Sequence, residues 1–463
     1  MRTRLRRSLG TALAGLALAL GASTAHGIAR AETLSGALAK AYEFAPPLNA
    51  VRAAQRALDE NVAIAKSGYR PVVQGQADYG ISGSPAISGP TGGPNISGTI
   101  SVNQTLFDGF QTRNAVRGAK AGVFAGQEDL RGTEQDTLLA AVNAYVAVVR
   151  DTRIIGFRRQ NIEFLNEQLN AAQARFEVGE GTRTDVAQAR AERAASVAEL
   201  EAAQANLRAS EALYIQVTGS QPTGLATPSP ARALTPGSME QAIDIAYSLH
   251  PSIRSAQFTA EQQAFGVKQA EGALLPSLGL SGSATRSRGA VGARGRPRIT
   301  SSRYDLGARL TVPLYQGGRA SAQVRQSKER LSQARIGVDI ARTQVRAGVV
   351  QAFSRFRSAQ AAQSSTAVQI SAARLALEGL IEERNVGQRT TLDVLLGRQA
   401  LINAQLAEAQ NDAVLVASSY ELVAAVGKLT ADRLGLHVAA YDPDEHYVAV
   451  KDKWYGLRTP DQR

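Results

Sequence analysis

Four segments of this chain alternate apolar and polar residues, the pattern of a β-strand with one apolar and one polar face. In one of them every second residue from Tyr304 to Leu314 is apolar. The others cover residues 73–81, 96–103 and 278–284. Each is about ten residues long, enough to span a membrane. A soluble two-sheet domain needs the same alternation, but no other sequence is available to cover these faces, so we favour membrane strands.

Two long stretches follow a helical period instead. Residues 95–221 contain no proline, and neither do residues 314–442. Apolar residues recur there at steps of three, four and seven, as in coiled coils. They include Ile155, Ile162, Leu165, Leu169 and Phe176, and later Leu395, Ile402, Leu406 and Ala409. The sequence therefore predicts long helices, the first over residues 110–178 and on the order of 100 Å long.

Each helical stretch is interrupted once by a turn. The two turns are Val178-Gly179-Glu180-Gly181-Thr182 and Val386-Gly387-Gln388-Arg389-Thr390. Glycine suits the end of a helix and threonine the N-cap of the next one. Each stretch is thus expected to fold into an antiparallel helical hairpin with its turn at the tip.

The sequence contains the strand pair and the helical hairpin twice. Leu106-Phe107-Asp108-Gly109 recurs 208 positions later as Leu314-Tyr315-Gln316-Gly317, and Tyr42 recurs 205 positions later as Tyr247. The period is too long for a solenoid and indicates two copies of one large unit. We expect repeats at 32–221 and 238–430, a linker at 222–237 and a tail at 431–463, extended or partly disordered from Leu436. Short helices near 34–66 and 239–272 should precede the strands.

Two further segments lie between the paired strands. The Gly-, Pro- and Ser-rich residues 82–94 and 286–298 are expected to form loops, the second with five arginines. Those arginines could meet phosphates of outer-leaflet glycolipid such as lipopolysaccharide, or the loop could simply be solvated.

The N-terminus and the composition indicate where in the cell the protein is expected to lie. Arg2, Arg4, Arg6 and Arg7 precede an apolar run and then small residues, which predicts a signal peptide over 1–25, or 1–31. Its loss lowers the net charge from +12 to +8, too little and too dispersed to imply nucleic acid. Without cysteine the chain has no disulfide and no acylated N-terminal thiol. Past residue 31 no window suits a transmembrane helix, so membrane insertion would need β-strands.

The sequence motifs do not support a catalytic function. The sequence has no P-loop, HExxH or GxSxG, and its four histidines lack metal-ligand spacing. We therefore expect no enzyme activity, no cofactor and no metal site.

Four strands cannot close a barrel, which takes about eight, so other copies of the chain should complete it. The order of signal peptide, short helices, strand pair and long hairpin, written twice, resembles the TolC family of outer-membrane channel proteins. The residues that carry the resemblance are Arg175–Val178-Gly179 through Thr184-Asp185-Val186, Asn385 to Leu395, and Asp452-Lys453-Trp454-Tyr455-Gly456 in the tail. The tail is similar to a non-acylated, α-proteobacterial branch of that family.

The resemblance implies an α+β membrane protein of the Gram-negative outer membrane. Three copies would form a twelve-strand transmembrane β-barrel and an α-helical periplasmic tunnel. The trimer would be a passive exit duct for an inner-membrane transporter of the ABC, RND or MFS class, joined by a periplasmic adaptor. Small-molecule efflux and type I protein secretion both remain open. The alternative is a periplasmic adaptor or structural coiled-coil protein without a pore, but an adaptor would normally show one hairpin flanked by β-rich domains.

The resemblance also implies roles at the tips. Thr184 and Asp185 of the first tip would face Arg389 of the second as a polar latch, and Asp393 would form an acidic ring one turn deeper. A second acidic ring is not expected, because Leu396 occupies its position. Adaptor docking would use Val178, Gly179, Gly181, Val386, Gly387 and Thr390. The alternative for Asp185 and Arg389 is an ordinary first-turn acid and a solvated tip cation.

Overall fold

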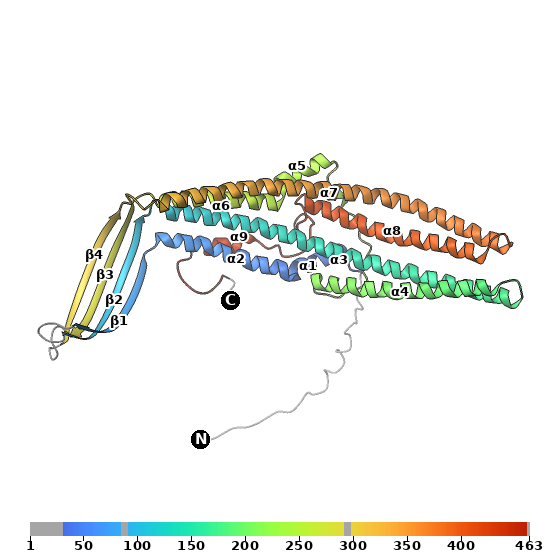
Figure 1. The fold of residues 1–463 in the computed structure, drawn as a ribbon, viewed down its shortest axis with the longest axis horizontal. Helices are drawn as coiled ribbons and strands as arrows, with labels where there is room; N and C mark the ends of the chain where they lie inside the picture. The colour runs from blue at the N-terminus through green and yellow to red at the C-terminus, as the bar shows by residue number, and fades with distance from the viewer. Residues whose placement is uncertain (1–30, 85–90, 291–297, 461–463) are drawn as a thin grey trace, which may run out of the picture.

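The computed structural model describes residues 31–84, 91–290 and 298–460. The chain forms an elongated slab of helices with a four-stranded sheet projecting from one end (Figure 1). The expected signal peptide lies outside the described residues, apart from Ala31. No helix in the described part combines the length and hydropathy needed to cross a membrane.

Two pairs of long helices confirm the predicted hairpins. Helices α3 (Gln111–Glu177) and α7 (Arg319–Asn385) each have 67 residues and begin 208 positions apart. Their returning arms are α4 (Arg183–Thr218) and α8 (Thr391–Ala425). At 1.5 Å per residue the longer arms are about 100 Å long.

Four shorter helices complete the slab, namely α1 (Leu34–Phe44), α2 (Pro46–Lys66), α5 (Met239–Leu249) and α6 (Pro251–Gly272). Helices α2 and α6 lie in the half nearest the sheet, and α1 and α5 lie near the middle of the slab (Figure 1). Helices α1 and α2 are separated just before Pro46, and α5 and α6 just before Pro251, because the residue before proline is forced into an extended conformation. Helix α2 lies in line with α4, and α6 with α8 (Figure 1). Each repeat therefore contains one long continuous helix (α3 or α7) and a second rod made of two aligned helices (α2 with α4, or α6 with α8). Helix α6 joins the repeats because it packs on both α3 and α7.

The sheet joins the repeats a second time. Its strands are β1 (Val72–Ser84), β2 (Thr91–Phe107), β3 (Ser277–Ala290) and β4 (Arg298–Thr311), antiparallel in the order β1-β2-β3-β4. The central pair β2–β3 comes from different repeats. Within the described part of one copy, the outer edges of β1 and β4 have no partner strand.

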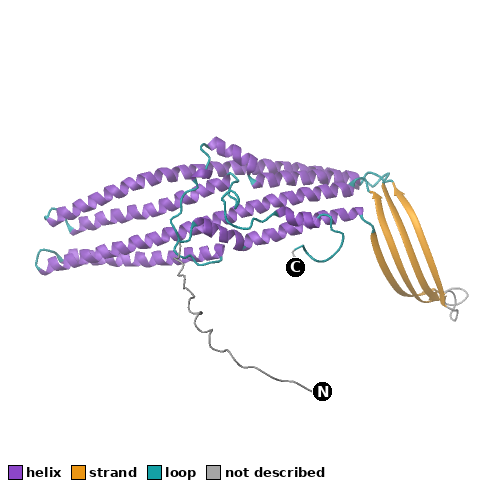
Figure 2. Ribbon diagram, turned by 180° about the vertical axis from the view of Figure 1, so that it is seen from behind, coloured by secondary structure: helices purple, strands orange, loops and turns teal. Residues whose placement is uncertain are grey.

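The register gathers the predicted apolar positions on one face. Val73 is opposite Val102, Gly282 opposite Leu306, and Ala284 opposite Tyr304. Among the described residues no helix covers this face, because the sheet extends beyond the slab (Figure 2). Leu306 is 91% exposed and Tyr304 81%. One copy thus leaves a broad apolar surface in contact with its surroundings.

Two expectations about the sheet are wrong. The strands have 13, 17, 14 and 14 residues, not about ten. The segments 82–94 and 286–298 are therefore not loops throughout: β1 runs to Ser84, β2 begins at Thr91, and Arg286 lies inside β3. Once the register is set, small Gly and Ser residues continue the ladder, because the main chain carries its hydrogen bonds. Residues 85–90 and 291–297 lie outside the described residues.

Tight packing fixes the sheet to the slab. Gly109 has a φ of +69°, and a Cβ built there would lie 2.2 Å from the carbonyl oxygen of Gly272. The Asp108 carboxylate accepts a hydrogen bond from the Thr112 amide at 2.6 Å, close to the start of α3. The end of β2 is thereby held against the end of α6.

The main hydrophobic core lies where α1, α3, α4 and α8 meet. Leu38, Leu138, Tyr214 and Val423 are among its buried members. A second core joins α5, α7 and α8, and a third, around Leu377 and Leu401, lies between α7 and α8 nearer the tip. Of the predicted seam residues, Ile155, Leu165, Ile402 and Ala409 are buried, whereas Phe176 is 43% exposed.

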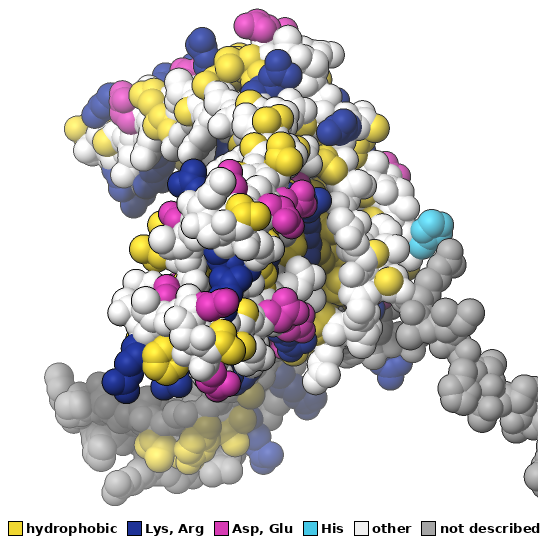
Figure 3. Space-filling model, turned by 90° about the vertical axis from the view of Figure 1, so that its right-hand side faces the viewer, with side chains coloured by type: hydrophobic (Ala, Val, Ile, Leu, Met, Phe, Trp, Pro, Cys, Tyr) yellow, Lys and Arg dark blue, Asp and Glu magenta, His cyan; other side chains and the backbone are white. Residues whose placement is uncertain are grey.

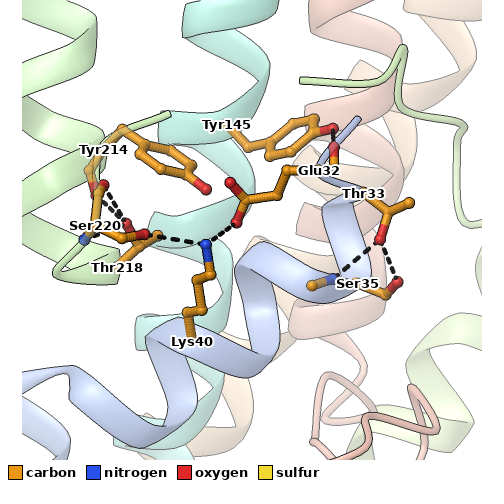
Figure 4. Close-up of polar contacts among 9 residues, drawn as sticks. Glu32, Thr33, Ser35, Lys40, Tyr145, Tyr214, Thr218 and Ser220 are labelled. Carbon is orange, nitrogen blue, oxygen red and sulfur yellow. Dashed lines mark hydrogen bonds and ion pairs between the residues drawn. The ribbon is translucent and has the colours of Figure 1, made fainter. Parts of the chain in front are cut away.

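A polar cluster ties the start of the described chain to the slab (Figure 4). Lys40 Nζ lies 2.7 Å from Glu32 Oε1. The hydroxyl of Tyr145 lies 2.7 Å from the carbonyl oxygens of both Glu32 and Ala226. Burial raises the pKa of Tyr145 to about 12, so the hydroxyl stays a donor. Tyr145 on α3 therefore holds two segments at one point: the residue before α1, Glu32, and the linker residue Ala226.

The tail corrects another expectation. Instead of being extended or disordered from Leu436, it contains helix α9 (Pro443–Val450), which packs on α2. His446 Nδ1 lies 2.9 Å from the buried Asp59 Oδ2. Farther on, the guanidinium of Arg70 stacks 4.7 Å from the ring centroid of Trp454. Composition alone underestimated the order because partners on α2, distant in sequence, hold this short polar helix.

Gly109→Ala should lower the apparent melting temperature of the purified protein markedly. Alanine would combine left-handed strain with a backbone clash against Gly272. The matched control is Gly317→Ala, where φ is +61° but no atom lies within 4 Å of the new Cβ. The control should cost only about 1 kcal/mol. Equal melting temperatures for the two variants would contradict the role given to this contact.

Candidate functional site: the two hairpin tips

The first tip is a glycine turn between α3 and α4. Gly179 has a φ of +81°, a conformation that favours glycine. The amides of Glu180 and Gly181 donate to the carbonyl oxygen of Arg175 at 2.9 and 3.1 Å. Helix α3 thus ends with its last carbonyl groups satisfied, and the backbone reverses within five residues.

The second tip repeats this geometry. Gly387 has a φ of +80°, and the amide of Gln388 donates to the carbonyl oxygen of Glu383 at 2.8 Å. Val178 and Val386 occupy equivalent positions and are 72% and 70% exposed. Figure 3, viewed from this end of the molecule, shows acidic and basic side chains interspersed with small apolar areas. Both tips therefore present an exposed valine beside a glycine.

Each returning helix begins with a capping box. Thr182 Oγ1 accepts from the Asp185 amide at 3.1 Å, and Asp185 Oδ2 accepts from the Thr182 amide at 3.0 Å. Thr390 and Asp393 form the same pair of bonds at 3.2 and 2.9 Å. Such reciprocal bonds satisfy two otherwise unpaired amides at a helix start.

The cap also affects the charge of Asp393. Its pKa is lowered, first by the hydrogen bond from the Thr390 amide. The stabilisation from the charged cap is therefore present above the ordinary value of 3.8 and is lost only as pH falls through the lowered pKa. Near neutral pH the carboxylate is ionised and could attract cations.

The second tip carries one further ion pair. Arg389 Nε lies 2.8 Å from Glu383 Oε2, and both side chains are about half exposed. The pKa of Arg389 is raised, first by its hydrogen bond to Glu383. Arg389 is therefore a permanent cation, held on its own hairpin in a single copy.

Within one copy the structure does not bring the expected latch together. Asp185 is engaged in its capping box and Arg389 with Glu383, while Thr184 is exposed. The alternative interpretation of Asp185 as a first-turn acid is thus realised in the single chain. Pairing of Asp185 with Arg389 remains a prediction about contacts between copies, as does the ring of Asp393.

Three arginines that the sequence did not single out link the two hairpins. Arg153 on α3 lies 2.7 Å from Asp412 on α8. Arg398 on α8 donates to Asn161 on α3 at 2.8 Å, and burial lowers its pKa. Nearer the tips, Arg384 on α7 donates to Gln168 on α3. Any movement of one tip against the other must strain or break these contacts. No spacing in the sequence distinguished them from ordinary surface arginines.

The chain matches the family described as outer membrane efflux protein over residues 37–220 and 242–428. It is 48% identical to the outer membrane efflux protein BepC of Brucella suis biovar 1 (strain 1330) over 94% of each chain. It is 25% identical to the outer membrane protein TolC of Escherichia coli (strain K12), covering 94% of this chain and 90% of that protein. The resemblance predicted from the sequence is confirmed.

The fold agrees as well. The crystal structure of the Campylobacter jejuni CmeC outer membrane channel superposes with a TM-score of 0.75 at 17% identity. The alignment covers 90% of this chain and 89% of that one. The architecture predicted for each repeat is thereby confirmed.

Substitutions at Asp393 should separate the cap from the charge. Asp393→Asn keeps an oxygen that can accept from the Thr390 amide, whereas Asp393→Ala removes it at a cost of about 1 kcal/mol. Hydrogen exchange of the amides at 390–394 should therefore quicken in the alanine variant and stay near the parent in the asparagine variant. Unchanged exchange in the alanine variant would show that the capping box does not hold this helix start.

Proposed function

The chain belongs to the outer membrane efflux protein family, and we propose on that basis that three copies form one channel through the outer membrane and periplasm. The observation that carries the proposal is the sheet: four strands with an apolar face uncovered and two open edges. Backbone groups in lipid must be hydrogen-bonded, so both edges need a partner. Pairing β1 of one copy with β4 of the next satisfies them.

The two faces of the sheet suit opposite sides of such a wall. The uncovered face carries Leu306 and Ile100, which would meet lipid. The other face carries polar residues, among them Thr99 and Thr285, whose hydroxyls lie 3.0 Å apart. Three sheets would make twelve strands around a polar interior, wide enough for a passage because about eight strands already fill theirs with side chains.

The slab of helices supports a tunnel beneath this barrel. Each copy contributes four helix lengths, namely α3, α7 and the aligned pairs α2–α4 and α6–α8. Three copies would supply twelve, arranged around one axis and continuous with the strands. The protein is thus placed in the outer membrane, with the tunnel in the periplasm.

The proposed activity is that of a passive duct. A periplasmic adaptor would join the tips to an inner-membrane transporter of the ABC, RND or MFS class, which would supply the energy. Efflux of small molecules is supported by the naming of BepC as an efflux protein; type I secretion would use the same architecture. A pore-less adaptor or structural coiled coil is not favoured, because it would not need strands with an uncovered apolar face.

The tips are proposed as the gate. Asp185 and Arg389 from neighbouring hairpins would pair when three copies bring the tips together, with Thr184 beside them and Asp393 facing the passage. Exposed ion pairs are worth about 0–1 kcal/mol each, and three copies act together. The closed state would then be favoured by a few kcal/mol, which adaptor docking could overcome.

Channel recordings test the duct and its gate together. The parent trimer should give small, stable conductance steps in planar bilayers, and Asp185→Asn or Arg389→Gln should enlarge them. Combining both should add little, because either one already removes the same contact. Asp393→Asn should instead weaken cation preference and block by multivalent cations.

The matched control for these recordings is Glu383→Gln. It removes the negative charge from the partner of Arg389 within one copy and should leave the conductance near that of the parent. A parent protein without any conductance would refute the duct. Latch variants that conduct like the parent would refute only the gate.

Docking at the tips can be mapped by crosslinking. Cysteine at Glu180 or Gln388, beside Gly179 and Gly387, should crosslink to the adaptor in cells, because glycine lets another backbone approach closely. Ser371, exposed on α7 and 14 residues before that helix ends at Asn385, is the control and should not react. Crosslinks from Ser371 but not from the tips would instead favour an adaptor wrapped around the helices.

A further inference from the structure

The uncovered apolar face changes character at one level of β3 and β4. From the slab outward, cross-strand pairs on this face run Leu278–Leu310, Leu280–Ala308, Gly282–Leu306, Ala284–Tyr304, Arg286–Ser302 and Arg288–Thr300. Four apolar or small pairs are thus followed by two that each contain an arginine. Arg286 and Arg288 are two residues apart on one strand, so both side chains lie on the same face.

The neighbouring strands stay apolar at this level. Arg286 is opposite Gly98 and Arg288 opposite Ile96, which in turn pair with Ala77 and Tyr79 on β1. The two guanidinium groups therefore border directly on apolar surface. Both arginines are exposed, and within the described residues neither takes part in an ion pair or a side-chain hydrogen bond.

A hollow of about 580 Å³ lies beside Arg286. Gly75, Ala77, Gly98 and Ala284 form its floor, and larger side chains, among them Tyr304 and Arg286, surround it. A Cβ built on Gly75 or Gly98 would meet no atom within 4 Å, so the floor is open. The hollow combines a small-residue floor with a cation at its rim.

The position along the strands matches the outer edge of a membrane. Arg286 is nine residues from the start of β3 at Ser277, about 30 Å along the strand. With a tilt of about 40° this is roughly 23 Å above the slab, close to the top of an apolar band about 25 Å tall. Cations are unfavourable at the middle of that band and tolerated at its edge. Lipid phosphates lie at this edge, and arginine binds phosphate through paired hydrogen bonds.

We propose that Arg286, Arg288 and the adjoining hollow bind a phosphate-bearing lipid of the outer leaflet. The phosphate is held by the two guanidinium groups, and an acyl chain lies over Gly75, Gly98 and Ala284. The site rests on the proposed function in one respect: the apolar face must meet lipid. It lies entirely on described strands and does not require the segment 291–297.

Native mass spectrometry of the purified trimer tests the site. Diphosphoryl lipid A, the same glycolipid without its phosphates, and inorganic phosphate serve as probes. The parent should retain diphosphoryl lipid A, and the double variant Arg286→Gln/Arg288→Gln should bind it at least tenfold more weakly. The dephosphorylated glycolipid should bind the parent about as weakly, and inorganic phosphate should not displace the lipid.

Two further variants isolate the parts of the site. Gly98→Leu fills the floor but keeps both arginines, and should also weaken binding severalfold. Arg303→Gln is the control: it lies at the same level on the opposite face, and should bind like the parent. Equal retention by the parent and the double variant, or full displacement by inorganic phosphate, would overturn the lipid site.

Conductance measured on the same samples distinguishes a failure of the lipid site from a failure of the proposed function. A trimer that conducts but shows no preference for the phosphorylated lipid overturns the lipid site alone. A chain that neither assembles nor conducts counts against the proposed function.

Discussion

The rest of the structure depends on one constraint, that main-chain N–H and C=O groups in lipid must be hydrogen-bonded. Among the described residues, one copy meets it only in the interior of its sheet, where β2 and β3 are paired on both sides. The free edges of β1 and β4, and the apolar face between them, are stable only when other copies pair with those edges and lipid covers that face. The proposed assembly thus follows from the sheet, and the proposed arrangement of the helices around one axis follows from that assembly.

The tandem repeat builds each copy from two similar but not identical halves. Tyr145 is fully buried and donates to the carbonyl oxygen of Glu32, just before α1, whereas Phe353, the equivalent residue on α7, is only partly buried. The difference arises because the tail and the linker pack on the first repeat. At the tips the backbone turns match closely, but only the second carries the Arg389–Glu383 pair. Two similar hairpins with different charges allow neighbouring tips to differ in the contacts they make.

Features set by local spacing could be predicted from the sequence, and those set by distant partners could not. The hairpin turns follow from glycine and threonine at Gly179 and Thr182, and the faces of the sheet follow from simple alternation. The strands were longer than expected, because small residues continue a ladder already in register. Helix α9 was missed because His446 and Trp454 find their partners on and just after α2. The latch could not be settled because Asp185 satisfies its hydrogen bonds locally, so its contacts between copies leave no signal in one chain.

Disulfide trapping across the open edges tests the central claim most directly, and the chain contains no cysteine of its own. Cysteine at Ser302 on β4 would be combined in turn with cysteine at Val73, Gly75, Ala77 or Tyr79 on β1. Within one copy β1 and β4 are three strand spacings apart, about 14 Å, whereas a disulfide needs Cα atoms within about 7 Å. In outer membranes at least one pairing should give reducible, covalently linked trimers. If every pairing leaves only monomers while the protein is in the membrane, the edges do not join and this account of the assembly is wrong.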